Sequence, residues 1–367
     1  MLNNHSSPGL WALAWRRLRG DKIAMLSLSV VALFLLMLAL SASGVIVSDW
    51  EDEVGVSYAP PNFSGAQSGA ERGPVAAPKS REPTPVNVLD PLADDIRELK
   101  AELGDSPAPQ IDMYGVEDPL AADIAQLRAG MKSSATSHAV KRETLPFGAD
   151  KWGHDIVKKT IKGAETSIVV GLIAALLAVV LGTLFGAFSG YYGGWIDDFF
   201  NWFYSIFTSI PSILMILTVA AVLQQKGVMT IVLILGLTGW TGPYRLIRAE
   251  YMKHKAREYV MAADAIGASS WRKMFSHIFP NVSHVALVQM SILVVGFIKA
   301  EVILSFLGFG VPVGVVSWGS MLNEAQNELI LGKWWQLTAA AAAMALLVTA
   351  FSLFTDALRD ALDPKLK

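Results

Sequence analysis

The organisation of this chain follows from the stretch at residues 245–281, which reads RLIRAEYMKHKAREYVMAADAIGASSWRKMFSHIFPN. The stretch is polar, carries seven Lys or Arg residues and separates two apolar segments. Its pattern predicts one short helix on each side of Gly267, because glycine adopts the backbone angles of a helix end at little cost. Ser269 or Ser270 is the expected N-cap of the second helix, over 271–278, and Pro280 is expected to stop it.

The flanking sequence indicates membrane spans, because a spanning helix needs roughly 20 largely apolar residues. Charged residues make up only 17% of the 367-residue chain, against about 25% in soluble domains. Six segments meet the requirement: 23–47, 166–192, 199–225, 228–244, 282–306 and 334–355. Pro211 interrupts the third of them and is expected to kink it. A signal peptide is the alternative for the first, but that run is longer than the apolar core of a signal peptide. We therefore predict an all-α polytopic membrane protein with six transmembrane helices.

Basic residues in the short flanks of the spans predict the orientation. Four of them precede the first span and place the N-terminal segment, 1–22, in the cytoplasm: Arg16, Arg17, Arg19 and Lys22. Threading six spans from there puts the 245–281 loop and the tail at 356–367 in the cytoplasm as well. Residues 48–145 then form a long periplasmic insertion. Because a basic inner loop is what the positive-inside rule alone predicts, its charge does not assign a function to 245–281.

The predicted insertion contains a linker and an internal repeat. Residues 58–87 are rich in Pro, Gly, Ser and Ala, which indicates a flexible linker. The sequences DPLADDIRELKA at 90–101 and DPLAADIAQLRA at 118–129 then repeat at a spacing of 28 residues. Each copy is typical of a short amphipathic helix capped by its Asp. The repeat is either a periplasmic docking element for a partner or an insertion that packs on its own membrane domain.

Several classes of function are disfavoured by composition. The chain has no cysteine, and its six histidines show no HExxH spacing, so we expect no metal site. The net charge of −2 argues against a nucleic-acid partner. The phosphate-binding motif GxxxxGK[ST] does not occur, since the one Gly-Lys pair, Gly332-Lys333, is followed by Trp334. We therefore expect a transport subunit without its own nucleotide site or cofactor, and not an enzyme.

Ionisable residues inside spans are costly and usually functional. Only Lys299 and Glu301 fall near a span, toward its outer end, and they are candidates for lining a translocation pathway. An ion pair with a partner subunit is the alternative. No acidic residue lies in the middle of a predicted span, which counts against a proton-coupled carrier. Three glycines spaced by four residues indicate close packing between spans, within the chain or with a second subunit: Gly182, Gly186 and Gly190.

The pattern Ala262-Ala263-x-x-x-Gly267, followed by Ile278-x-Pro280, resembles the EAA loop of ABC-importer permeases, with Met261 where that family usually has Glu. Further stretches resemble the dipeptide and oligopeptide permeases in the same order: PFGADKWGHDIVKKTIKGAETSIVVG at 146–171, SGYYGGWIDD at 189–198, LSFLGFGVPVGVVSWGSML at 304–322 and DALRDALDPKLK at 356–367. His154 replaces the usual Arg in the first of them. Over 146–367 the chain is similar to the second, C-type permease subunit of a peptide-class importer.

This resemblance implies a type I ABC importer permease fold in the bacterial inner (cytoplasmic) membrane, with a permease core at 146–355. It also implies a second homologous permease, two cytoplasmic ATPase subunits that carry ATP and Mg, and a periplasmic binding protein that delivers a di- or oligopeptide. The 245–281 loop would dock on the ATPases and convert their closure into rocking of the spans.

The candidate coupling residues are Tyr259, Ala262, Ala263, Ile266 and Gly267, with Trp271 as a further contact. An ATP-independent channel or carrier is the alternative function, and such a protein has no need of a docking element. A scaffold protein whose outer repeat is the working part is a third possibility.

Overall fold

The computed structural model describes residues 10–65 and 141–362, and of these residues 10–65 and 142–362 pack into one unit. All regular structure in the described ranges is helical. β pairing there is limited to isolated bridges: Gly55–Arg142, Pro61–Leu145 and Ala149–Asp155. The predicted all-α class is therefore confirmed. The repeat at 90–129 and most of the linker at 58–87 lie outside the described residues.

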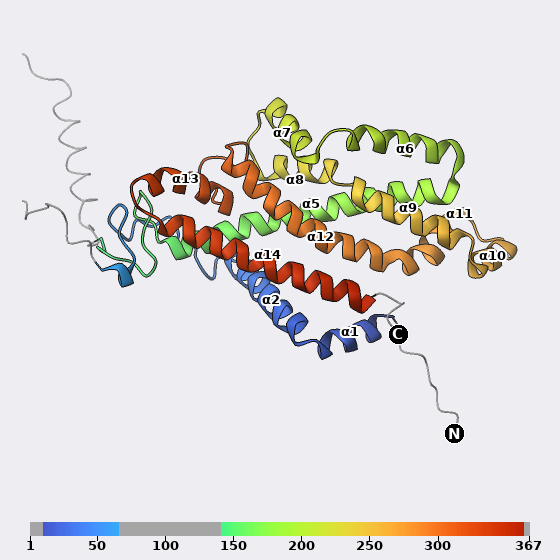
Figure 1. Ribbon diagram of the computed structural model, residues 1–367, viewed down its shortest axis with the longest axis horizontal. Helices are drawn as coiled ribbons and strands as arrows, with labels where there is room; N and C mark the ends of the chain where they lie inside the picture. The colour runs from blue at the N-terminus through green and yellow to red at the C-terminus, as the bar shows by residue number, and fades with distance from the viewer. Residues whose placement is uncertain (1–9, 66–140, 363–367) are drawn as a thin grey trace, which may run out of the picture. The chain divides into compact units, whose positions relative to one another are not determined.

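Helix α5, Ile156–Tyr192, is the helix on which the others pack. The side chain of Asp155 caps its start by accepting a hydrogen bond from the Val157 amide at 2.8 Å. Gly193, with φ of 68°, ends it. The helices that lie against it include α2 (Lys22–Ala42), α8 (Val228–Thr238), α9 (Thr241–Lys255), α12 (Phe279–Phe306) and α14 (Trp335–Leu362) (Figure 1).

Within the described residues, four helices are long and apolar enough to cross a membrane: Lys22–Ala42, Ile156–Tyr192, Ser270–Phe306 and Trp335–Leu362. Helices α6 (Gly194–Thr208) and α7 (Ser212–Leu223) make a fifth if they are counted as one span bent by 82°. Pro211 lies at that break, so the predicted interruption of the span is confirmed.

The count of six spans is not confirmed. The predicted span 228–244 contains helix α8, whose 11 residues give a length of about 17 Å, shorter than the apolar layer. The chain then turns at Gly239 and Trp240 before α9 begins. This fourth predicted span, and with it the count of six, therefore stays a prediction.

The three glycines predicted to serve close packing lie on α5 against the backbone of α9. A Cβ atom added to Gly182, Gly186 or Gly190 would come within 2.6, 2.8 and 2.5 Å of a carbonyl oxygen of α9 or the turn before it. Those oxygens belong to Trp240, Tyr244 and Arg248, respectively. The glycines thus bring two helices of the same chain together, and a second subunit is not needed to explain their spacing.

Aromatic rings fix α6 beside the start of α9. Trp240 is fully buried and stacks on Phe203 of α6 with ring centroids 5.2 Å apart. Phe207 of α6 and Phe185 of α5 meet the same indole edge-on, each at 5.3 Å. Such pairs add to the free energy of area burial, so Trp240 holds three helices together at one point.

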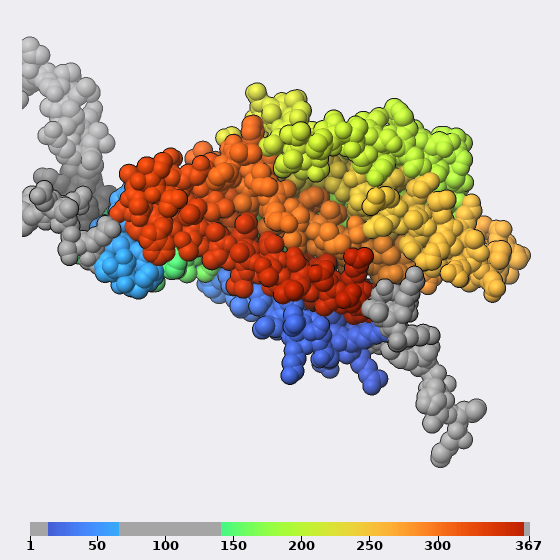
Figure 2. All heavy atoms as spheres, viewed as in Figure 1, coloured from blue at the N-terminus to red at the C-terminus, as the bar shows by residue number. Residues whose placement is uncertain are grey.

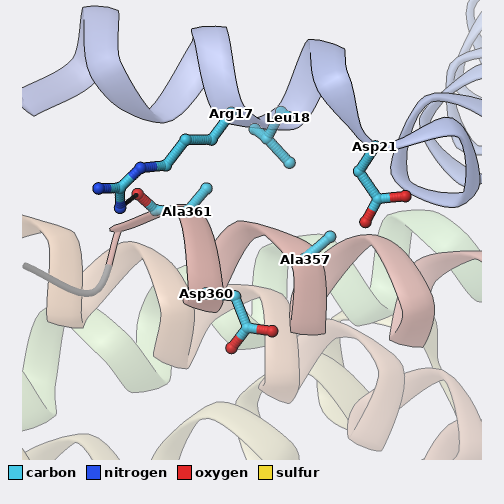
Figure 3. A pocket seen from close by; sticks show the side chains of 6 residues that line it. All are labelled: Arg17, Leu18, Asp21, Ala357, Asp360 and Ala361. Carbon is cyan, nitrogen blue, oxygen red and sulfur yellow. Dashed lines mark hydrogen bonds between the residues drawn. The ribbon is translucent and has the colours of Figure 1, made fainter. Parts of the chain in front are cut away.

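The two ends of the described chain pack against each other. Helix α1, Leu10–Gly20, lies along the end of α14, and the guanidinium of Arg17 donates to the carbonyl of Ala361 at 3.3 Å. Asp21 and Asp360 line the shallow hollow between them (Figure 3). Figure 1 shows both ends toward the same end of the helix bundle as α10, while α13 lies at the opposite end. The two described ends and the 245–281 segment therefore lie toward one end of the bundle, and the side of the membrane that they face stays a prediction.

A buried ion-pair cluster ties the elements at the opposite end of the bundle. Lys159 of α5 is 4% exposed and donates to Asp150 at 2.7 Å and to Glu324 of α13 (Trp318–Ile330) at 2.6 Å. Gln336 of α14 donates to the same Glu324 carboxylate at 3.2 Å. Burial by itself would raise the pKa of Asp150, but the ammonium of Lys159 holds that pKa below its usual value. One lysine therefore joins the loop before α5 to α13 and α14.

Glu328 of α13 is buried beside this cluster without sharing its hydrogen bonds. Both carboxylate oxygens are inaccessible to solvent and accept no hydrogen bond from any residue that the structure describes. Burial raises the pKa of Glu328 to about 7, against a weaker opposing effect of Lys159. Helix α13 is not among the candidate spans of the described residues.

Gly186→Ala is expected to destabilise the protein by about 1–3 kcal/mol, because the new methyl group would press on a helix backbone that has no rotamer to change. The measurement is the midpoint of thermal unfolding of the purified protein in detergent. Gly296→Ala on α12 is the matched control, since a Cβ there meets nothing within 4 Å. Equal midpoints for the two variants would contradict the close approach of α5 and α9.

Glu328→Gln is expected to raise the unfolding midpoint at pH 8 and to change it little at pH 5. The folded-state pKa of about 7 lies above the ordinary value of 4.5. The folded protein therefore binds more protons than the unfolded chain between these values, and its stability falls as pH rises through 7. Glutamine does not ionise, so the variant does not lose this stability as the pH rises. Glu324→Gln removes a partner of Lys159 and should lower the midpoint at pH 8; the same sign for both variants would contradict the assignment.

Candidate coupling site

The 245–281 stretch begins with two helices where one was predicted. Helix α9 ends at Lys255, Arg257 is extended with φ −84° and ψ 147°, and α10 (Glu258–Ala265) follows. The single helix expected over this part is therefore wrong. The division has an electrostatic reason, because Lys253, His254 and Lys255 fill the last turn of α9 and Glu258 stands in the first turn of α10. The helix dipole favours cations in the last turn of a helix and anions in the first turn.

Gly267 ends α10 as predicted. Its φ is 78°, and its amide donates to the carbonyl of Asp264 at 2.9 Å. The amide of Ala268 donates to the carbonyl of Ala263, also at 2.9 Å. These two hydrogen bonds form a Schellman motif, in which the left-handed residue is most easily a glycine.

The second helix starts as expected and ends elsewhere. Ser269 is its N-cap and accepts a hydrogen bond from the Arg272 amide at 3.4 Å. The expectation that Pro280 stops it is wrong, because the helix continues to Phe306 through a π-helical turn at Lys273–Ile278. A π turn is wider than an α turn, which relieves the clash between a proline ring and the preceding turn. The coupling segment is therefore continuous with a candidate span.

One face of α10 is packed against its own chain. Val260 and Ala263 are 4% and 5% exposed. Val260 belongs to a core cluster formed with α5, α9, the π turn and the start of α12: Ala187, Tyr191, Ile247, Tyr251, Met274, Ile278 and Val282. Lys273 forms an ion pair with Asp264, which ties the two ends of the turn together. The position of α10 is thus set by residues that face inward.

The other face of α10 and the turn after it carry large apolar side chains in contact with solvent. Met261 is 55% exposed, Ile266 84% and Trp271 62%. Tyr259 is also exposed, and its hydroxyl is hydrogen-bonded to Nδ1 of His254 at 2.8 Å. Figure 2 shows this segment projecting beyond the neighbouring helices of the unit. The segment lies at one end of the helix bundle (Figure 1).

The structure separates the five candidate coupling residues into two groups. Four are exposed on or beside α10: Tyr259, Ala262, Ile266 and Gly267. Ala263 faces inward, so its small size serves the packing of α10 on its own chain. Met261 joins the exposed group, although sequence reasoning treated it only as a departure from a pattern. An apolar residue in a basic, polar stretch is the signal that identifies it.

The two candidate pathway residues lie on different faces of α12 and are not brought together. Glu301 is completely buried and accepts hydrogen bonds from Ser167 of α5 at 2.6 Å and from Ser305 at 2.7 Å. Ser167 also accepts a hydrogen bond from the Trp318 amide at 3.3 Å, so this network joins α5, α12 and α13. Lys299 is exposed. Their place in a pathway stays a prediction, and the burial of Glu301 favours a role in helix packing.

Comparisons with known proteins agree with this architecture. Residues 182–367 match the family model described as binding-protein-dependent transport system inner membrane component. Residues 9–61 match the N-terminal TM domain of oligopeptide transport permease C.

Two relatives come from Bacillus subtilis (strain 168). The chain is 37% identical over 240 residues to its dipeptide transport system permease protein DppC, covering 64% of this chain and 75% of the relative. The chain is 38% identical over 221 residues to the oligopeptide transport system permease protein OppC of the same strain, covering 60% of this chain and 72% of the relative. The first family match spans half of the chain, and the described helices include several that are able to cross a membrane. The chain therefore belongs to the family of binding-protein-dependent transport system inner membrane components, as a multi-pass transport subunit and not an enzyme.

Proposed function

We propose that this chain is a permease subunit of an ATP-driven importer of di- or oligopeptides. The substrate class is supported by the names of its relatives, which are dipeptide and oligopeptide transport system permease proteins. Dependence on a periplasmic binding protein is supported by the family description. In this proposal a second, homologous permease completes the pathway, and two cytoplasmic ATPase subunits carry ATP and Mg.

The observation that carries the proposal is the exposed apolar face at the end of the bundle, formed by Met261, Ile266 and Trp271. Several large apolar side chains exposed in one short segment outside the lipid region indicate a protein-binding site. The sequence has no GxxxxGK[ST] motif, so an ATP-driven role requires a separate ATPase subunit to bind this face.

The packing of the segment explains how docking would move the spans. Helix α10 is fixed to α9 and to the π turn by buried residues, and α9 lies with its backbone against the glycines of α5. Close-packed interfaces of this kind resist local deformation, so a displacement of α10 is transmitted as a rigid-body movement. Helix α5 then carries that movement along its full length toward the outer ion-pair cluster.

The alternative function is an ATP-independent channel or carrier. It would leave the exposed face of α10 without a partner. Purification of the tagged chain from its native membrane separates the two functions. ATPase subunits that accompany the chain support the importer, whereas a chain that purifies alone and conducts solute in liposomes supports the channel.

Ile266→Glu is expected to reduce the amount of ATPase subunit that co-purifies by about tenfold or more, since a charge at the centre of an apolar interface removes its main contact. Ile266 is 84% exposed in the single chain, so the substitution leaves the fold intact. The measurement is the ratio of ATPase subunit to tagged chain on a quantified gel.

Ile330→Glu is the matched control, because Ile330 is also 84% exposed and lies on α13 at the opposite end of the bundle. This variant should retain the ATPase subunits. Loss of the subunits from both variants, or from neither, would contradict the assignment of the docking face while leaving the family unchanged.

A further inference from the structure

Away from the docking face, α6 and α9 are joined by a two-pronged ion pair between Asp197 and Arg248. Nε of Arg248 donates to one carboxylate oxygen of Asp197 at 2.6 Å, and the second guanidinium nitrogen, Nη2, donates to the other at 2.6 Å. The side chains are 17% and 26% exposed, so the pair is shielded from most of the solvent. Paired, parallel hydrogen bonds of this kind fix direction as well as distance.

Two further residues form hydrogen bonds to Asp197, one to its carboxylate and one to its backbone. Ser189 of α5 donates to Asp197, and its hydroxyl lies 3.1 Å from the hydroxyl of Tyr244 on α9. The side-chain amide of Asn201, one turn further along α6, donates to the backbone carbonyl of Asp197 at 2.8 Å. The start of α6 is therefore attached to both α5 and α9 by polar contacts.

Helix α6 needs such an attachment because the chain is interrupted at each of its ends. Gly193 precedes α6 and Gly194 is its first residue, and both have a positive φ. The 82° bend to α7 follows its last turn. None of its own residues is fully buried. Its position is set by the Trp240 ring contacts in its second half and by the Asp197–Arg248 pair at its start. Without the pair, the two glycines are free to act as a hinge.

We propose that the Asp197–Arg248 pair is a positioning element that makes the inner half of the third predicted span, α6, move together with the coupling segment. Arg248 lies on α9, which packs on the inner face of α10, so a displacement of α10 reaches α6 directly through the guanidinium. The transport role of this movement rests on the proposed function, whereas the mechanical linkage of α6 to α9 does not.

The first test measures the linkage alone. The sequence has no cysteine, so spin labels are placed only where cysteines are introduced, by Trp202→Cys on α6 and Met252→Cys on α9. Both positions are at least half exposed. A narrow distribution of the distance between the labels is expected in the otherwise unchanged chain, and Asp197→Asn should broaden it.

Asp198→Asn is the matched control, because Asp198 is the neighbouring exposed carboxylate and no hydrogen bond or ion pair joins it to the described residues. It should leave the distribution narrow. The paired exchange Asp197→Arg with Arg248→Asp should restore the narrow distribution. An unchanged distribution in Asp197→Asn would overturn the proposal and reduce the pair to a surface contact.

The second test measures transmission in the purified assembly. Labels on α6 and α14, at Trp202→Cys and Leu353→Cys, report how far α6 moves when ATP and vanadate are added. Asp197→Asn should reduce the shifted population about fivefold or more, a typical size for a coupling between sites, while ATP hydrolysis continues. Full movement of α6 in this variant would overturn the proposal. A wild-type assembly without ATPase subunits would instead refute the proposed function, and the first test would still decide on the linkage.

Discussion

The contact between the glycines of α5 and the backbone of α9 is the constraint on which the rest of the structure depends. Carbonyl oxygens of α9 and the turn before it lie where side chains would stand at Gly182, Gly186 and Gly190. A residue larger than glycine would prevent this close approach of the two helices, and no side chain lies between them at these positions to adjust its rotamer. Helix α10 and the start of α12 share a buried cluster with α5 and α9, so their positions depend on this interface.

The two ends of the bundle are built on opposite principles. At the end that carries α13, the buried Lys159 pairs with Asp150 and Glu324, an arrangement that is costly to open because each group would lose its partner. At the end that carries α10, the apolar side chains of Met261 and Ile266 face solvent. In the proposed importer, the first end would stay rigid while the second receives the driving force.

Sequence reasoning was sufficient where a local rule decides the structure. Gly267 at a helix end, Ser269 as an N-cap and the break at Pro211 each follow from backbone chemistry within a few residues. It failed at Pro280, because the π turn that accommodates the proline depends on tertiary packing around Met274 and Ile278. The predicted span 228–244 is not confirmed, since apolar composition alone does not show where α8 ends and α9 begins. The pairing of Asp197 with Arg248 joins residues 51 positions apart, and no periodic pattern reveals it.

The division within the Ala262-Ala263 pair shows why a short motif needs a structure to be interpreted. Both residues are small and adjacent, yet on a helix adjacent positions point about 100° apart and therefore face different neighbours. Ala263 is buried and allows α10 to lie close to its own chain, whereas Ala262 is exposed, as are Met261 and Ile266. Small size therefore serves packing at one position, and in the proposed docking element it would serve contact with a partner at the other. A docking element requires both, because a partner transmits force only through a helix that is held from behind.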